Sequence, residues 1–314
     1  MIGSDGAAVA PYLLRGDRVR VIAPSGPVVA AGIAPGMKVL EQLGLQVSLA
    51  EHALTRRSMS TVSDDEQVSD LRAAFGDADL RAVIAARGGY GVQRLIDRIA
   101  EGVLASSTAV FLGFSDLTAL HLRLFREHGR VSLYGPTLSS WARMSEGDAK
   151  LSADSLAQAL MSPGRSWSIS RDELEPTAPL SAGVPVTGTM LGGNLAMLAS
   201  SVGTPDQLRP PAGGILLLED VREPPYRVDR MMWQLARSGC FDQLAGLALG
   251  QFVDCTGPPT APSVLDVLRD WTERLGMPTL GGLSIGHGAR QDTVALGCAA
   301  RIDPAAGVLI CNPS

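Results

Sequence analysis

Ser115 follows an apolar segment, residues 109–112 (AVFL), with Gly113 and Phe114 between them, and precedes leucines at helical spacing. At such a strand–turn–helix junction a serine hydroxyl is lifted out of the sheet, and backbone N–H groups of the new helix can hold an oxyanion. Residues 113–115 match the first half of the G-x-S-x-G nucleophile elbow, although Leu117 replaces the second glycine. The pattern indicates a nucleophile at Ser115, with a helix N-cap as the alternative.

A serine nucleophile needs a general base, and the chain has 4 histidines. Three of them lie in an expected helix or loop, where packing or solvation explains them: His52, His121 and His128. The fourth, His287, lies between two glycines after an apolar segment, which permits a close approach of the backbone. We therefore predict that His287 is the base.

The third member of such a site is a carboxylate that orients the imidazole and stabilises its positive charge. Glu219 follows four apolar residues at the expected end of a strand, and Asp220 is the neighbouring candidate. Either side chain has an alternative role as a helix cap or in an ion pair with Arg222 or Arg227. We predict Glu219 as the third member.

A glycine-rich segment, residues 87–91 (RGGYG), follows a second apolar run. It matches neither G-x-G-x-x-G nor the phosphate-binding lysine motif, so a phosphate cradle is not indicated. The turn at Gly88 and Gly89 would let a peptide approach the main chain, and one of its N–H groups could join that of Asp116 around an oxyanion. A simple tight turn is the alternative.

Neither a metal nor a cofactor is indicated. The only lysines are Lys38 and Lys150, which leaves little scope for Schiff-base or P-loop chemistry. The 4 cysteines lie far apart without a C-x-x-C pair, so buried thiols are expected rather than a zinc site or disulfides.

The composition limits the partners. The 314 residues are 46% hydrophobic and 19% charged, with a net charge of -5 and no long basic run, which argues against nucleic acid. No apolar stretch approaches the roughly 18 residues of a membrane helix, and residues 1–5 lack the cationic opening of a signal peptide. We expect a cytoplasmic protein without a membrane partner.

Apolar strands alternate with helical segments in the first half, which is typical of a parallel sheet covered by helices. The expected strands are 19–23, 45–49, 82–86, 109–112 and 131–134, and residues 63–66 (SDDE) have capping-box spacing. The second half has strands at 186–191 and 215–218 and a terminal hairpin over 300–311, so a mixed sheet is expected there. A polar segment without sustained period separates the halves. The expected organisation is therefore an N-terminal α/β domain over 1–145, a connection over 146–184 and a C-terminal domain over 185–314.

Taken together, the motifs resemble those of the LD-carboxypeptidases, whose relatives include the microcin C immunity peptidases. The resemblance covers nearly the whole chain and rests on these segments: GD at 16–17, VIAPS at 21–25, ARGGYG at 86–91, GFSD at 113–116, YGP at 134–136, GGNL at 192–195, LEDV at 218–221 with Glu223, PYR at 225–227 and DR at 229–230, GQF at 250–252, and GHG at 286–288.

The resemblance implies a serine peptidase in which Ser115 attacks, His287 carries the proton and Glu219 orients His287. Gly88, Gly89 and Asp116 would bind the oxyanion, and no metal is implied. It also implies a flavodoxin-like N-terminal domain, a smaller β-rich C-terminal domain and a homodimer. The implied activity is release of the terminal D-alanine from murein tetrapeptides in peptidoglycan recycling, with an arginine anchoring the terminal carboxylate: Arg87, Arg227 or Arg230.

The chain departs from the family where a histidine often precedes Gly-Pro, here Tyr134, where a proline is common after the catalytic histidine, here 294–297 (VALG), and near residues 60–69. One alternative is therefore a microcin-C-type hydrolase of aminoacyl nucleotide analogues, which needs an aromatic platform such as Trp141, Trp167 or Trp233. The other is a two-domain protein that binds a small ligand and uses Ser115 only as a cap.

Overall fold

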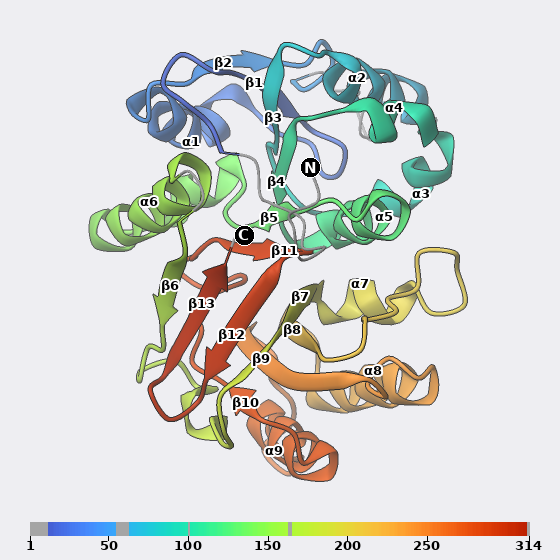
Figure 1. The fold of residues 1–314 in the computed structure, drawn as a ribbon, viewed down its shortest axis with the longest axis vertical. Helices are drawn as coiled ribbons and strands as arrows, with labels where there is room; N and C mark the ends of the chain where they lie inside the picture. Colours follow the sequence, from blue (N-terminus) through green and yellow to red (C-terminus); the bar gives the residue numbers. More distant parts are fainter. Residues whose placement is uncertain (1–11, 55–62, 100, 163–164, 313–314) are drawn as a thin grey trace.

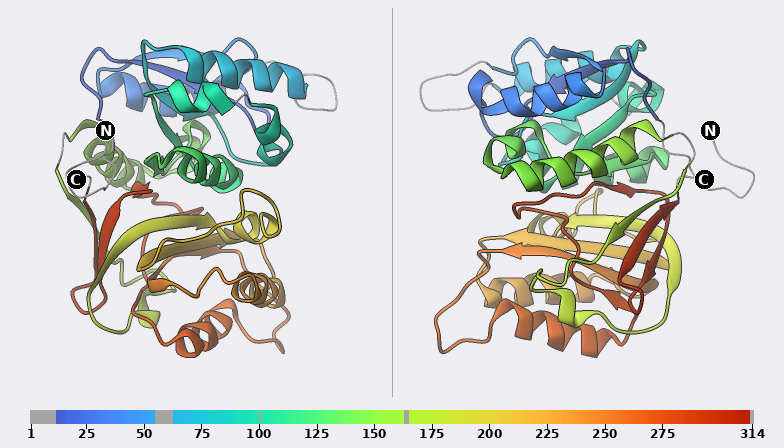
Figure 2. Two further views of the ribbon diagram at one scale, coloured as in Figure 1. Left: turned by 45° about the vertical axis from the view of Figure 1, so that its right-hand side comes forward. Right: turned by 90° about the vertical axis from the view of Figure 1, so that its left-hand side faces the viewer.

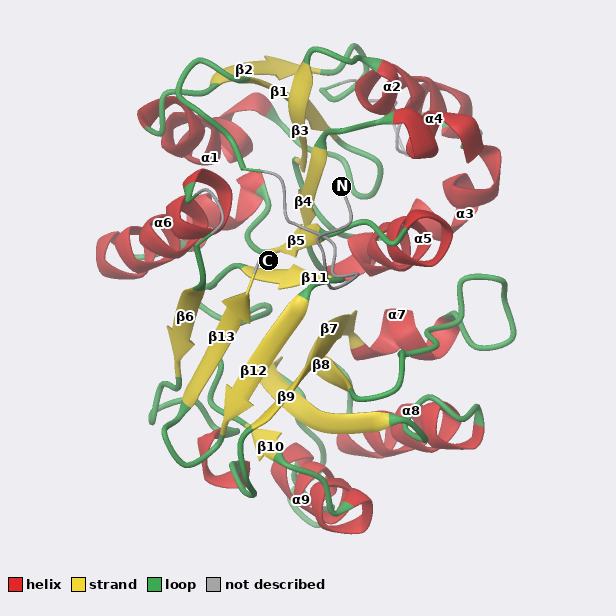
Figure 3. Cartoon of the chain, in the orientation of Figure 1, coloured by secondary structure: helices red, strands yellow, loops and turns green. Residues whose placement is uncertain are grey.

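Two β-sheets lie one above the other, and helices flank each of them (Figures 1 and 3). The structure is a computed structural model and describes residues 12–54, 63–99, 101–162 and 165–312. The opening residues, on which the expectation about a signal peptide rests, lie outside these ranges. None of the helices described is long and apolar enough to cross a bilayer.

The first sheet has the strand order β11-β5-β4-β3-β1-β2. Its five N-terminal strands run parallel in the flavodoxin-like order, which confirms the expected fold of this half. Their bounds are β1 Arg18–Ile22, β2 Gln46–Leu49, β3 Leu80–Ala85, β4 Val110–Gly113 and β5 Ser132–Tyr134. The sixth strand, β11 (Val294–Leu296), comes from the C-terminal half and pairs antiparallel with β5. This strand is not among those that the sequence pattern predicts.

The helices of the first half stand on both sides of this sheet (Figure 1). They are α1 Ala30–Gln42, α2 Asp64–Gly76, α3 Val92–Leu95, α4 Glu101–Ser106 and α5 Thr118–His128, with 3₁₀ turns at Ile96–Arg98, Ser115–Leu117 and Leu138–Arg143. The predicted capping box is present, since the Ser63 hydroxyl accepts from the Glu66 N–H and the Glu66 carboxylate accepts from the Ser63 N–H.

The second sheet is mixed, as expected, with the order β10-β9-β8-β7-β12-β13-β6. Strands β7 to β10 run parallel and the other three antiparallel. Their bounds are β6 Trp167–Ser170, β7 Val186–Asn194, β8 Gly214–Val221, β9 Leu244–Val253, β10 Thr279–Leu280, β12 Ala299–Asp303 and β13 Val308–Asn312. The predicted terminal hairpin is β12 and β13.

The expected connection, 146–184, is more ordered than its polar composition indicates. It holds the 16-residue helix α6 (Glu146–Met161), which begins at a Ser145 cap, and β6, which pairs with β13. Its buried apolar residues are few, which hides the helical period in the sequence. A 3₁₀ turn follows at Ala178–Leu180. Because β6 of the expected connection joins the second sheet and β11 of the second half joins the first, the domain boundaries stay a prediction.

Strand β8 contributes to two cores. Leu216 and Leu218 pack in a cluster with the helices α7 (Leu195–Ser200), α8 (Pro225–Arg237) and α9 (Val264–Leu275). Ile215 and Leu217 belong instead to the cluster that extends through the first half. Since alternate strand residues face opposite sides of a sheet, Glu219 lies on the side of Ile215 and Leu217, and Asp220 lies on the side of Leu216 and Leu218.

Candidate active site

Ser115 begins the short 3₁₀ turn that follows β4. Its φ of 66° lies in the left-handed region, which a residue with a side chain adopts only when the surroundings hold it there. This backbone lifts a partly exposed hydroxyl away from the strand, as in a nucleophile elbow.

His287 reaches Ser115 from the opposite half of the chain. The imidazole Nε2 lies 3.0 Å from the Ser115 Oγ, and the Nδ1 lies 2.7 Å from the Glu219 Oε2. Gly286 has a φ of 131°, and a Cβ there would stand 2.6 Å from the Glu219 Oε2. A glycine before His287 is therefore required for the carboxylate to reach the imidazole.

Glu219 is fully buried on β8 and its carboxylate is well supplied with donors. Besides His287, the Tyr134 hydroxyl donates to its Oε1 at 2.8 Å and the Asn194 Nδ2 donates at 3.2 Å. Because two hydrogen bonds hold the Oε1, the other oxygen is presented to His287. The carboxylate is fixed in the orientation that a Ser–His–Glu arrangement needs.

Asp220, the competing carboxylate, points to the other side of β8. It accepts from the Ala196 N–H at the start of α7 and from the Asn194 Nδ2, both at 2.9 Å. Burial, followed by the neighbouring charge of Glu219, raises the pKa of Asp220 to about 7. Asp220 therefore supports Asn194 and α7, while Glu219 faces His287.

The pKa of His287 is raised above its ordinary value. Burial by itself lowers this pKa, but the charge and the hydrogen bond of Glu219 outweigh burial, and the charge of Asp220 adds to them. Arg143 acts in the opposite direction through its positive charge. The environment thus favours the imidazolium that forms when a base takes a proton from serine.

The glycine turn lies against the serine. An ideal Cβ on Gly88 would stand 3.0 Å from the Ser115 Cβ and 3.3 Å from its Oγ, so only a glycine leaves the hydroxyl unobstructed. Gly89 follows with a φ of 136°. Asp116 adjoins Ser115 in the chain, so two of the three residues predicted for the oxyanion site, Gly88 and Asp116, are next to Ser115, whereas Gly89 lies against Gly26.

The side chain of Asp116 has a role that the sequence did not reveal. It is buried, and its Oδ2 accepts from the Ser25 hydroxyl at 2.6 Å and from the Val92 N–H at 3.0 Å. Asp116 therefore ties the turn after β1 and the start of α3 to the serine elbow.

The other histidines have structural surroundings, as expected. His121 is buried, its Nδ1 lies 2.7 Å from the Ser132 Oγ and its Nε2 lies 3.0 Å from the Gly113 carbonyl oxygen. Burial lowers the pKa of His121 to about 4. The His52 Nδ1 lies 2.9 Å from the Asp70 Oδ1, and the His128 Nε2 lies 3.5 Å from the Glu127 Oε2.

Two residues of the site are not marked by the sequence pattern. The buried Tyr134 hydroxyl accepts from the Ser115 N–H at 3.1 Å while it donates to Glu219. Arg143 lines a pocket of about 200 Å³ together with His287. In the sequence Tyr134 stands out only as a departure from a family pattern, and Arg143 precedes a polar segment without a recognisable motif.

Across the described ranges, no three His, Cys, Asp or Glu side chains gather in a way that would hold a metal ion. The 4 cysteines are free and buried. Burial raises the pKa of each thiol, most moderately at Cys255, to about 11.

Comparisons with known proteins agree on one family. The description "LD-carboxypeptidase N-terminal domain" matches residues 19–135, and "LD-carboxypeptidase C-terminal domain" matches residues 187–302. The murein tetrapeptide carboxypeptidase of Pseudomonas aeruginosa is 33% identical over 87% of this chain and 89% of its own.

Solved structures agree with this result. The muramoyltetrapeptide carboxypeptidase from Oxalobacter formigenes superposes with a TM-score of 0.79 at 31% identity, covering 94% of this chain and 97% of the other. MccF in complex with glutamyl sulfamoyl guanosine superposes with a TM-score of 0.86 at 19% identity, over 97% and 98% of the two chains. The second likeness shows a shared fold.

Proposed function

Because the chain belongs to the LD-carboxypeptidase family and is a serine-type carboxypeptidase, we propose that it releases the terminal D-alanine from murein tetrapeptides. The observation that carries the proposal is the continuous chain of hydrogen bonds from Ser115 through His287 to Glu219. We place the reaction in cytoplasmic peptidoglycan recycling and propose a homodimer.

In the first step the Ser115 Oγ attacks the carbonyl carbon of the L,D-peptide bond while the His287 Nε2 takes the hydroxyl proton. Glu219 stabilises the resulting imidazolium. The developing oxyanion receives hydrogen bonds from backbone N–H groups of Gly88, Gly89 and Asp116. His287 then gives its proton to the nitrogen of D-alanine, the C–N bond breaks, and an ester remains on Ser115.

In the second step water replaces D-alanine. His287 takes a proton from the water, whose oxygen attacks the ester carbonyl, and the same imidazolium returns the proton to the Ser115 Oγ. The shortened peptide leaves with a new carboxylate. Both steps need His287 to be neutral at the start.

A microcin-C-type substrate is the alternative with which the fold is compatible. The tryptophans proposed for an aromatic platform give it little support: Trp141 and Trp167 are buried, and the Trp167 Nε1 donates to the Thr293 carbonyl oxygen. Trp233 is partly exposed but packs edge-on against Trp271. We therefore favour the murein peptide.

The deciding assay offers murein tetrapeptide and an aminoacyl sulfamoyl nucleoside to the same preparation. We expect D-alanine from the first compound and no amino acid from the second. Release from the second compound alone would replace the proposed function by the alternative.

A fluorophosphonate probe tests the role of Ser115 without a substrate. We expect labelling of the wild-type protein and none after Ser115→Ala, while His287→Ala reduces the labelling rate strongly because the serine loses its base. If Ser115 stays unlabelled in the folded wild-type protein, its hydroxyl is not activated, and a protein that binds a ligand without cleaving it replaces the proposed function.

A further inference from the structure

A small pocket opens beside the catalytic histidine. It has a volume of about 200 Å³, and its lining includes His287, Gln291 and Arg143. Sites for drug-sized ligands usually measure about 300 to 1,000 Å³. The volume therefore suits one small terminal residue better than a long peptide.

Arg143 is the cationic side chain among these lining residues. It ends the 3₁₀ turn Leu138–Arg143, its side chain is exposed, and no hydrogen bond or ion pair holds its guanidinium within the described part of the chain. Its charge acts on the imidazole of His287. An unpaired guanidinium at this position is available for a carboxylate, which it can bind with two parallel hydrogen bonds.

Gln291 provides a second, independent indication of a ligand. Its side chain is 2% exposed, and its Oε1 has no hydrogen-bond partner in the structure described. A buried acceptor without a donor is costly, and the N–H of a bound peptide would satisfy it. The pocket thus combines a cation for a carboxylate with an acceptor for an amide.

The arginines proposed from the sequence are already engaged. The Arg87 Nη1 donates to the Pro27 carbonyl oxygen at 3.1 Å, and the Arg227 Nε lies 2.9 Å from the Glu223 Oε2. The guanidinium of Arg230 stands 5.3 Å from the centroid of the Tyr226 ring. None of the three lines this pocket.

We infer that Arg143 binds the terminal carboxylate of the substrate, with the last residue seated in the pocket beside His287. The inference rests on the proposed carboxypeptidase function and names its specificity-determining residue. In a peptide the terminal carboxylate lies one residue beyond the scissile carbonyl, so its anchor must stand near the serine and histidine. Arg143 then holds the terminal residue in register with Ser115.

The first test compares murein tetrapeptide with its C-terminal amide. For Arg143→Gln we expect kcat/KM on the acid to fall about 10- to 100-fold, mainly through KM, with little change on the amide. Arg143→Lys should restore part of the loss, since it returns the charge without the planar fork. Gln291→Met should lower kcat/KM by the same factor for the acid and for the amide, because both substrates have the peptide N–H.

Arg269→Gln is the matched control, since it removes the same charge from an exposed arginine of α9 that pairs with Asp266. It should leave both substrates unchanged. The inference is wrong if Arg143→Gln keeps the wild-type preference in kcat/KM for the acid over the amide. It is also wrong if Arg87→Gln or Arg227→Gln removes that preference instead.

A binding measurement separates this site from the proposed function. By titration calorimetry we expect the wild-type protein to bind N-acetyl-D-alanine at least 10-fold more tightly than its amide, and Arg143→Gln to remove the difference. If tetrapeptide is not cleaved but this difference is found, the proposed function fails and the carboxylate site stands. If tetrapeptide is cleaved but no difference is found, the function stands and the site fails.

Discussion

Glu219 decides how basic His287 is. With the pKa of His287 raised above 6.5, kcat/KM should decline on the acid side as pH falls through that raised value, because the protonated imidazole cannot accept the serine proton. Glu219→Gln removes the charge that raises the pKa. We expect turnover to fall by up to about 10⁴-fold and the acid limb to move to lower pH, in pH profiles of kcat/KM for both proteins.

Asp220→Asn is the comparison for Glu219→Gln, since it removes the adjacent carboxylate on the opposite side of β8. It should cost far less turnover and move the acid limb only slightly, because Asp220 contributes to the pKa of His287 without touching the ring. A larger loss in Asp220→Asn than in Glu219→Gln would reverse the assignment of the two carboxylates.

Tyr134 links the backbone of the nucleophile to Glu219 through one hydroxyl. Tyr134→Phe keeps the ring in its packing with Phe114 and His121 but leaves the Ser115 N–H without this partner. We expect about a 10- to 100-fold loss in kcat with little change in KM, and a loss of about 1 to 2 kcal/mol in the free energy of unfolding. Steady-state kinetics and urea unfolding measure both.

The exposed Tyr12, changed to phenylalanine, serves as the control and should alter neither quantity. If Tyr134→Phe retains full kcat, the strained backbone of Ser115 is held by packing alone.

Tyr134 and Arg143 also show where residue-level prediction stops. Ser115, Glu219 and His287 each follow a strand or stand between glycines, so their local sequence marks them. Tyr134 and Arg143 have no such mark, and their roles depend on which chain segments meet after folding. A tyrosine that ends a buried strand is ordinarily a packing residue, and only its distance to Glu219 reveals more.

At the scale of elements, the turn after β3 and the elbow after β4 are fitted to each other at Gly88 and Ser115. Gly88→Ala places a methyl group 3.0 Å from the Ser115 Cβ, and the nearby backbone must shift to accept it. We expect kcat to fall at least 10-fold, since a displacement of a few tenths of an ångström at the nucleophile misaligns its attack. The kcat and the fluorophosphonate labelling rate should fall together.

Gly102→Ala is the matched control, because Gly102 lies in α4 and nothing stands within 4 Å of an added Cβ. It should leave kcat unchanged and raise the free energy of unfolding by about 0.5 to 1 kcal/mol through helix propensity. Full activity in Gly88→Ala would show that the elbow tolerates movement.

The sequence predicted most elements of the two sheets but not how the sheets meet. Strand alternation already separates Glu219 from Asp220 in the sequence, yet which side of β8 faces the first half follows only from the packing of Ile215 and Leu217. The three-residue strand β11 is too short to show a period. Its partner β5 lies about 160 residues away in the chain, and no local pattern identifies a partner at that distance.

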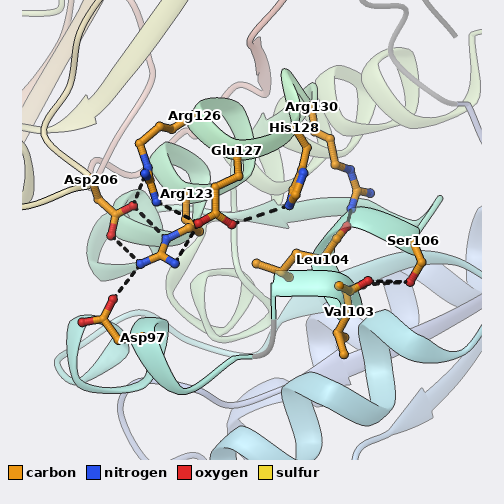
Figure 4. Close-up of polar contacts among 11 residues, drawn as sticks. Asp97, Val103, Leu104, Ser106, Arg123, Arg126, Glu127, His128, Arg130 and Asp206 are labelled. Carbon is orange, nitrogen blue, oxygen red and sulfur yellow. Dashed lines mark hydrogen bonds and ion pairs between the residues drawn. The ribbon is translucent and has the colours of Figure 1, made fainter.

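At the scale of the whole molecule, the nucleophile Ser115 and its base His287 lie on different halves of the chain, so the contact between the halves is part of the site. Strand β11 lies at the boundary between them (Figure 2). Close to the elbow, the Thr118 hydroxyl accepts from the Asn194 N–H at 3.1 Å. Farther out, Arg123 of α5 and Asp206 of the second half form an ion pair with two hydrogen bonds, at 2.8 and 2.9 Å (Figure 4).

This ion pair is largely removed from water, with 10% and 11% of the two side chains exposed. Asp97 and Glu127 add further carboxylates to Arg123, and Arg126 adds a second cation to Asp206 (Figure 4). Burial lowers the pKa of Arg123, but Asp206 outweighs burial and the net pKa is raised. Removing one partner therefore leaves a poorly solvated charge, which costs more than an exposed ion pair contributes.

We expect Arg123→Met to lower the free energy of unfolding by roughly 2 to 4 kcal/mol, and Arg123→Met with Asp206→Leu to lower it by less than the sum of the single changes, because each single change already loses the interaction between the two side chains and the sum counts that loss twice. Urea unfolding of all four proteins gives the coupling energy. Arg269→Gln, which breaks an exposed ion pair, should cost less than about 1 kcal/mol of the free energy of unfolding.

The Arg123–Asp206 pair can also be tested by kinetics. If it holds Ser115 and His287 in register, kcat of Arg123→Met falls under conditions where the protein remains fully folded, while KM changes equally for the amide and the acid substrate. Additive single changes with an unaltered kcat would instead mean that other contacts between the halves, among them the pairing of β11 with β5 and the Thr118–Asn194 hydrogen bond, set their placement.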